Sequence, residues 1–333
     1  MAKKPIRRSV RVTKNLSKNQ KSQVAKIAKA SVKQIAEKKY MHTKTTFGDQ
    51  DTSYVNPTRP VGNDYISCVG FSSTIGESDV GASVTYGGQA IHDLMCLRPF
   101  TDSQTDDTLK AFAPDGKFIQ PVSCKTQWRL NRDFARIDPT RSGSPPDFPA
   151  SLAENCPIIC RMIKCTANIP AGTSTELDPD NDLFIDEYGR AVGTAADNFD
   201  ERETLFYKVN RRRWSVLEDK KFKILSPVTL QYQQDFANTG TSNYTPIIAA
   251  TNSNCEKYIV TNHQLSKRKN GKIYYDKYDN ETLNATAGHR REYVFFHFLY
   301  QGADAITGSE AGRAKGPLGV NISCVNYTKF IDV

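Results

Sequence analysis

Long apolar runs, catalytic or metal-binding motifs and N-terminal acidic residues are all scarce in this sequence. No stretch among the 333 residues approaches the length of a transmembrane helix. The N-terminus has no apolar run of the kind found in signal peptides. We therefore expect a protein that is neither secreted nor embedded in a membrane.

The eight cysteines form no Cys-x-x-Cys pair, and none has a histidine at zinc-ligand spacing. Most of them lie in apolar, strand-like segments, as Cys160 and Cys165 do. We expect buried structural thiols in a reducing compartment, where disulfides are rare.

Catalytic motifs are absent as well. There is no Gly-x-Ser-x-Gly, no Gly-Lys-Ser/Thr and no His-x-x-x-His. His297 lies in the apolar run YVFFHFLY, so we expect it in the core. His92 and Asp93 are adjacent and would point to opposite faces of a strand. The sequence therefore predicts that the protein is not an enzyme.

Charge is strongly segregated along the chain. Residues 1–40 contain thirteen Lys or Arg and one acid, Glu37, which gives a net charge of +12. The whole chain carries +9, so the remaining residues together carry −3. A near-neutral body is therefore joined to a polycationic arm. The basic residues of the arm are Lys3, Lys4, Arg7, Arg8, Arg11, Lys14, Lys18, Lys21, Lys26, Lys29, Lys33, Lys38 and Lys39.

A charge block of this kind repels itself, buries little and is suited to binding phosphates. Each Lys or Arg that neutralises a phosphate releases condensed counterions, and no base contact is required. We therefore expect the arm to bind nucleic acid, with a slope of log K against log salt of at most about −8 for a single strand. A solubility tail or a membrane-surface segment is the alternative, although the arm has few aromatic or bulky aliphatic residues for anchorage.

Helical periodicity runs through residues 17–39. Ser17 is a candidate N-cap, and Gln20, three residues later, completes a capping box. Apolar or small residues then recur at helical spacing, which leaves several lysines off that stripe. We expect a short amphipathic helix that forms when its stripe docks on the body or on another subunit. The stripe consists of Val24, Ile27, Ala28, Ser31, Val32 and Ile35.

After the arm we expect a polar connector at 41–64 and a single body domain at 65–333. The body alternates β-branched and aromatic segments with turn clusters, and it has no helical periodicity of any length. Without a βαβ rhythm, this pattern predicts an all-β antiparallel sandwich or barrel. Asn270-Gly271 predicts a hairpin turn. The strand candidates include 65–71, 118–130, 158–168, 205–209, 214–217, 222–232, 291–300 and 320–333.

Four segments carry recognisable patterns: CRMIKCTAN at 160–168, Asp-Leu-Phe at 182–184, NRRRWSVLEDKKFKI at 210–224 and YTKFID at 327–332. Together they resemble the capsid proteins of Rep-encoding circular single-stranded DNA viruses. The jelly-roll coats of tombus-like and noda-like RNA viruses share the basic arm and remain an alternative.

The resemblance implies a single jelly roll, an antiparallel eight-stranded β-sandwich with long loops. It also implies a structural protein that self-assembles into an icosahedral shell, with on the order of 60 or 180 copies. Such a shell packages a single-stranded genome through the basic arms. The expected location is the virion, with assembly in the host nucleus or cytoplasm, and the resemblance does not specify the host receptor.

A second group of cations lies in the body. Arg211, Arg212 and Arg213 precede a strand-like segment that contains Lys221 and Lys223. Strand alternation would turn Trp214, Val216, Phe222 and Ile224 into the core and Arg213, Lys221 and Lys223 outward. These cations either form an inner wall that contacts phosphates, or pair with the nearby acids Glu201, Glu203, Glu218 and Asp219.

Alternate carboxylates at Asp178, Asp180 and Asp182 suit Ca²⁺, which takes several oxygen ligands. They do not form an EF-hand, because the sixth position is Leu183 and the twelfth is Gly189. A calcium site at a subunit interface and a solvated acidic loop remain open. The sequence predicts no other cofactor.

Two further function classes compete with a capsid. A non-viral nucleic-acid-binding β-sandwich of low oligomeric state would concentrate basic and aromatic residues on one sheet face of the body. A carbohydrate-binding jelly roll would place a cluster of aromatics on loops, yet the sequence has two Trp, both in strand-like runs.

Overall fold

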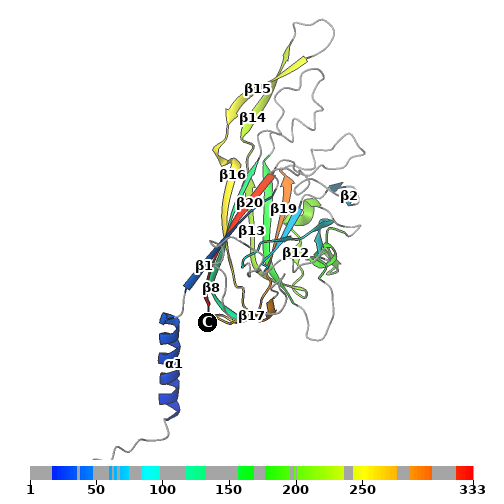
Figure 1. Cartoon of the computed structure of the whole chain (residues 1–333). Coiled ribbons are helices and arrows are strands. Elements are labelled where there is room, and N and C mark those ends of the chain that lie inside the picture. Colours follow the sequence, from blue (N-terminus) through cyan, green and yellow to red (C-terminus); the bar gives the residue numbers. More distant parts are fainter. Residues whose placement is uncertain are drawn as a thin grey trace, which may run out of the picture.

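The computed structural model is mainly β, with antiparallel sheets and an N-terminal helix (Figure 1). Among the described residues, no helix is long and apolar enough to span a membrane. The structure describes residues 17–35, 38–47, 60–61, 64–65, 68–74, 84–97, 118–132, 157–168, 177–195, 199, 201–235, 243–275, 285–301 and 320–332.

The larger sheet, which we call the outer sheet, has the order β1-β20-β8, and β8 then pairs with both β16 and β17. All pairs in it are antiparallel, including that of β17 with β18. Its strands are β1 (Lys38–Phe47), β8 (Phe118–Arg132), β16 (Glu256–His263), β17 (Ile273–Tyr275), β18 (Ala285–Ala287) and β20 (Val320–Asp332).

The second sheet, which we call the central sheet, has the order β13-β9-β19-β4-β7. Its pairs are antiparallel except for the parallel pair of β4 with β7. Its strands are β4 (Cys68–Ser72), β7 (His92–Asp93), β9 (Ile158–Ala167), β13 (Trp214–Ile224) and β19 (Tyr293–Tyr300).

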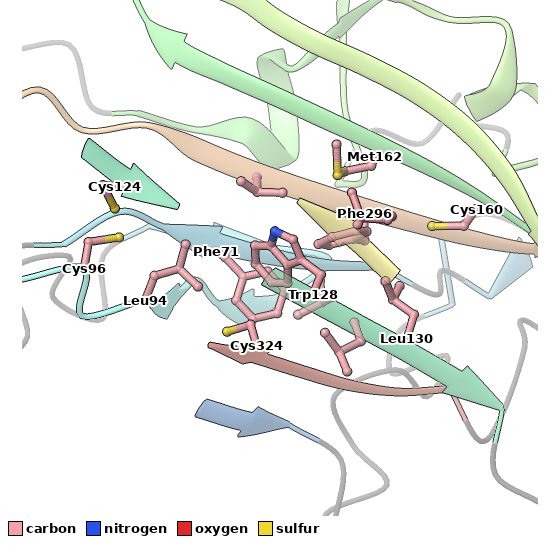
Figure 2. Close-up of a cluster of buried hydrophobic side chains, with 14 of the residues drawn as sticks. Phe71, Leu94, Cys96, Cys124, Trp128, Leu130, Cys160, Met162, Phe296 and Cys324 are labelled. Atoms are coloured by element: carbon pink, nitrogen blue, oxygen red, sulfur yellow. The ribbon is translucent and has the colours of Figure 1, made fainter. Parts of the chain in front are cut away.

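The main core lies between these two sheets (Figure 2). Trp128 of the outer sheet packs edge-on against Phe71 and Phe296 of the central sheet, with ring centroids 4.9 and 5.1 Å apart. Burial of each such ring contributes about 1.5–3 kcal/mol. Figure 2 also shows Cys160 and Met162 of β9 directed into this cluster.

A third layer covers the other face of the central sheet. It packs Phe184, Tyr207 and Val209 against Trp214 and Phe295. The inner strands β9 and β19 are therefore buried on both faces, which explains why they are almost continuously apolar, whereas much of the edge strand β13 is exposed. The elements of this layer are β5 (Thr85–Tyr86), β6 (Gln89–Ala90), α4 (Pro179–Asp182), β10 (Phe184–Ile185), β11 (Ala191–Val192), η1 (Glu201–Leu205) and β12 (Lys208–Val209).

Two further strand pairs complete the described chain. β14 (Val228–Asp235) and β15 (Asn243–Thr251) form a two-stranded hairpin that projects from one end of the body (Figure 1). β2 (Pro60–Val61) pairs with β3 (Asp64–Tyr65), and the short helix η2 (Ser253–Cys255) precedes β16.

The expected helix is confirmed as α1 (Lys18–Ile35). Its capping box is present, since the Gln20 amide donates to Ser17 Oγ over 3.3 Å and the Ser17 amide donates to Gln20 Oε1 over 3.0 Å. The expected end at residue 39 is wrong because Lys38 and Lys39 already belong to β1. Residues 41–47 of the expected connector also lie in β1, where they pair with residues 322–328 of β20.

The body strands follow the expected pattern with three corrections. Residues 214–224 form one strand, β13, where two were expected. The expected strand at 205–209 begins as the helix η1 and is extended only over β12. Asn270 adopts a left-handed turn with φ 57°, but no hairpin follows, because β17 pairs with β8 and β18.

The expectation of buried thiols is confirmed for most of the described cysteines, none of which forms a disulfide. Cys255 is half-buried. Burial raises the pKa of the Cys160 thiol and of the Cys165 thiol well above the ordinary value of a cysteine. The remaining buried ones are Cys68, Cys96, Cys124 and Cys324.

Candidate nucleic-acid interface

The predicted arm is partly described. Lys18, Lys21 and Lys26 are exposed on α1, which carries five lysines and no acid. Lys29 and Lys33 lie on the same helix. In β1, Lys38 is exposed, whereas Lys39 is 6% exposed. The other predicted arm residues, Lys3, Lys4, Arg7, Arg8, Arg11 and Lys14, lie outside the described residues.

The apolar stripe of α1 does not dock on the body where its side chains are described. Val24 is 52% exposed and Ile27 is 66% exposed. Figure 1 shows α1 extending away from the body, beyond the end of β1. A helix of this length is marginal alone in water, so a partner that contacts it would stabilise it.

The solvent-facing side of the outer sheet carries basic and aromatic side chains. Alternation along β8 buries Cys124, Trp128 and Leu130 and exposes Lys125 and Arg129. The neighbouring strands contribute in the same way, and we call the resulting surface the outer face. Its residues are Tyr40, His42, Lys125, Arg129, Tyr258, Tyr327 and Lys329.

Cross-strand pairing brings these side chains together near β1. Tyr40 lies opposite Lys329, whose Nζ is 5.1 Å from the centre of the tyrosine ring. His42 lies opposite Tyr327, and the two rings stack with their centroids 5.6 Å apart. Tyr327 in turn lies opposite Lys125 on β8. Aromatic and cationic groups thus lie side by side on three adjacent strands.

The β16 edge of the outer face has the same composition. Arg129 lies opposite Tyr258, which is 67% exposed. Glu256 forms an ion pair with Arg129 and accepts a 2.8 Å hydrogen bond from the Tyr258 hydroxyl. The hydrogen bond from Arg129 lowers the pKa of the Glu256 carboxyl. Rings and cations are therefore present on the outer face from β1 to β16, with Glu256 as the acid beside Arg129.

The second predicted group of cations is not assembled into one exposed wall. Arg213 Nε donates to Asp182 Oδ2 over 2.7 Å, so it pairs with an acid that was not among its expected partners. Lys221 donates to the Leu205 carbonyl. Arg211, Arg212 and Lys223 are exposed.

The side chains of β13 do not all point to one core, because a β-bulge lies between Val216 and Glu218. Trp214 and Val216 pack with the third layer, whereas Phe222 and Ile224 pack between the two sheets. Lys220 pairs with Glu218 over 2.6 Å. Asp219 accepts two hydrogen bonds from the buried Arg161 guanidinium, which also donates to the Thr204 and Tyr207 carbonyls.

The three aspartates proposed as calcium ligands are not brought together. Asp180 is buried and accepts hydrogen bonds from the Gly87 amide over 2.6 Å and from Thr85 over 2.7 Å. Asp182 accepts from Trp214 Nε1 over 2.9 Å as well as from Arg213. Among the described residues, no group of three or more His, Cys, Asp or Glu is arranged to hold a metal ion.

Charged residues inside the sandwich were missed by sequence reasoning. Lys164 and Glu292 are both buried and form a 2.8 Å ion pair. His263 Nδ1 lies 3.1 Å from the same carboxylate. Burial would raise the pKa of Glu292, but the hydrogen bond from His263 and the charge of Lys164 lower it. Lys164 also donates to the Asn262 carbonyl on β16, so this cluster joins the two sheets.

The outer face was also missed, although a signal for it exists. Segments 118–130 and 320–333 alternate between apolar and polar residues, and their polar positions include Lys125, Arg129, Tyr327 and Lys329. The alternation marks a half-buried strand. What it does not show is which strands are neighbours.

No protein-family model matches the sequence, and no curated protein matches it. Among solved structures, the selenomethionine-labelled mavirus penton protein aligns over 89% of this chain and 100% of that chain, with 9% identity and a TM-score of 0.14. A TM-score this low carries no weight for fold or function, so function is argued from the chain's own geometry.

Proposed function

We propose that this protein is a viral capsid protein that assembles into an icosahedral shell and packages a single-stranded genome through its N-terminal arm. The observation that carries the proposal is the separation of charge. A helix with five lysines and no acid leads into the edge strand of a β-sandwich whose own charges nearly cancel. The arm is suited to bind phosphates, and the near-neutral body is suited to pack against copies of itself.

The body of this capsid protein is a single jelly roll, and the strand order supports it. Eight of the described strands form the main part of the two sheets. In chain order, the first, third, sixth and eighth of them (β1, β8, β16 and β20) belong to the outer sheet. The second, fourth, fifth and seventh (β4, β9, β13 and β19) belong to the central sheet. In space, the outer sheet runs β1-β20-β8-β16 and the central sheet runs β4-β19-β9-β13. The first strand thus lies beside the last, and the second beside the seventh, as two interlocked Greek keys require.

The projecting hairpin β14–β15 lies between the fifth and sixth of these strands. Ile248 on it is 51% exposed. A two-stranded hairpin is marginally stable alone, so contacts between neighbouring subunits would stabilise it. In a closed shell, this hairpin supplies a contact surface beyond the sandwich itself.

Assembly is the direct test. The purified full-length protein, examined by electron microscopy and light scattering with and without single-stranded nucleic acid, is expected to form closed particles of uniform diameter. A stable monomer under both conditions, at high protein concentration, would contradict the proposal.

The arm is tested by a deletion that ends before Lys38. A deletion through residue 40, by contrast, would remove residues paired with β20. The shortened chain is expected to remain folded and to lose most of its salt-dependent affinity for nucleic acid. Unchanged affinity, with the same salt slope as the full chain, would show that the arm does not hold the genome.

The outer face favours a second candidate, a non-viral nucleic-acid-binding β-sandwich of low oligomeric state. That class would place basic and aromatic residues on one sheet face, as the outer sheet does. The two candidates differ in assembly: the second predicts a monomer or small oligomer that binds nucleic acid without forming particles.

A further inference from the structure

We propose that the outer face is a second binding site for single-stranded nucleic acid, at which bases stack on tyrosine rings and cations contact the phosphates. The proposal rests on the proposed function, in which the arm binds the same strand. It assigns a role to seven residues of the outer sheet that the charge of the arm does not explain. The rings are Tyr40, His42, Tyr258 and Tyr327, and the cations are Lys125, Arg129 and Lys329.

The three tyrosine side chains of the outer face are largely exposed to solvent. Tyr40 is 56% exposed, Tyr327 is 46% exposed and Tyr258 is 67% exposed. Val260, also on β16 and opposite Gln127 of β8, adds a 49% exposed apolar side chain. Exposed apolar and aromatic groups that gather on one face mark an interaction surface.

The rings lie along a diagonal of the outer face. β1 and β16, three strand spacings apart in the order β1-β20-β8-β16, are separated by about 14 Å. Through Lys329, Tyr40 lies level with Ser123 of β8, whereas Tyr258 lies level with Arg129, about 20 Å further along the strands. A strand that contacts all the rings would therefore cross the sheet diagonally, with several nucleotides between Tyr327 and Tyr258. Four-stranded sheets that present exposed aromatics stack two or three bases on such a surface. Tyr40 lies at one edge, Tyr327 next to it and Tyr258 at the far edge, with a cation opposite each.

The rings are already held in place before a ligand arrives. Tyr327 stacks on His42, and Lys329 lies over Tyr40. Tyr258 donates its hydroxyl proton to Glu256. Side chains ordered in advance lose less conformational entropy on binding.

Charge and chain continuity favour nucleic acid over a second copy of the protein. The outer face carries three cations beside one acid, which complements phosphate. α1, with five lysines, ends three residues before β1, which carries Tyr40 and His42. A strand bound by the arm therefore passes the edge of the outer face.

The test separates stacking from charge. Binding of a labelled oligothymidylate to the full-length protein is measured at elevated salt, where the electrostatic contribution of the arm is reduced. The probe is paired with an abasic oligomer of the same length, which has the same phosphates and no bases. Tyr258→Ala and Tyr327→Ala are each expected to lower the affinity for oligothymidylate about tenfold and to leave the affinity for the abasic oligomer unchanged.

Two controls make the result specific. Tyr188→Ala removes a tyrosine that is 74% exposed but lies outside the outer sheet, and it is expected to bind like the original chain. Tyr258→Phe and Tyr327→Phe keep the rings and are expected to retain affinity. Thermal unfolding checks that every variant is folded.

Each alternative outcome overturns the inference in a distinct way. Equal losses for both oligomers would mean that the tyrosines do not stack bases. Unchanged binding by both alanine variants, together with lost binding after deletion of residues 1–37, would reject the outer face and leave the proposed function intact. Altered particle assembly with unchanged binding would show that a second copy covers the outer face. Absence of binding by the original chain, even at low salt, would reject the proposed function itself.

Discussion

The two large sheets share one core but are built from different kinds of sequence. The outer sheet is buried on one face, and β8 alternates between buried residues such as Trp128 and exposed residues such as Arg129. The inner strands of the central sheet are covered on both faces, and Tyr293–Leu299 of β19 is buried throughout. The comparison teaches that the central sheet provides stability, while the outer sheet presents a chemically specific surface to solvent.

The strongest test of this division is the buried ion pair of the central sheet. Glu292→Gln leaves the Lys164 ammonium in the interior without its carboxylate. We expect the free energy of unfolding to fall by about 3–5 kcal/mol, measured by urea denaturation. Adding Lys164→Met should recover part of the loss, because no unpaired charge is then buried. A loss below about 1 kcal/mol for Glu292→Gln would mean that water reaches the pair.

Truncation of core side chains is expected to have the next largest effect. Met162→Ala removes a fully buried side chain of β9 that packs between the sheets. We expect a loss of about 2–5 kcal/mol in unfolding free energy, since a cavity remains. Tyr258→Ala, on the outer face, is the matched control and should change stability by about 0.5 kcal/mol or less. Equal losses for the two variants would remove the distinction between the sheets.

Acid is expected to weaken the central sheet through His297. Burial, and secondarily the charge of Arg161, lower the pKa of His297 from 6.5 to about 3. Below pH 6.5 the unfolded chain binds a proton that the folded chain does not, so stability present above pH 6.5 is lost as the pH falls toward 3. From His297 alone we expect a loss of about 2 kcal/mol between pH 6.5 and about 5.

The measurement is urea unfolding at several pH values. His297→Gln should reduce the pH dependence by that amount while the contributions of other buried histidines remain. If the slope is the same in the original chain and the variant, His297 is not the neutral buried group that its surroundings indicate.

The smallest effect is expected for the exposed ion pair of the outer sheet. Glu256→Gln removes the carboxylate that pairs with Arg129. Because both side chains are partly in solvent, we expect unfolding free energy to change by less than about 0.5 kcal/mol. A loss comparable to that of Glu292→Gln, in the same denaturation assay, would show that the outer face is more buried than the geometry indicates.

Local signals predicted much of the fold. The capping box placed the start of α1 at Ser17, and runs of β-branched and aromatic residues placed β8, β9, β19 and β20. The predicted ends of helices and strands were wrong where pairing with a distant strand determines them. Lys38 and Lys39 continue the basic composition of the arm, but pairing with β20 extends them into β1.

The candidate site was predicted less completely. Density of Lys and Arg is a local property, so the arm was visible in the sequence. The outer face depends on register, because Tyr40 and Lys329 are far apart along the chain and adjacent only through the β1–β20 pair. The bulge at Val216 and Glu218 likewise redirects β13, which no local pattern announced.

Composition and periodicity were sufficient to establish a polycationic helix ahead of a mainly β body, since both depend on residues close together along the chain. Which strands become neighbours, which acids neutralise Arg213 and Lys164, and which exposed rings share one face depended on folding. These are contacts between distant segments, and their energies exist only once the sheets have packed.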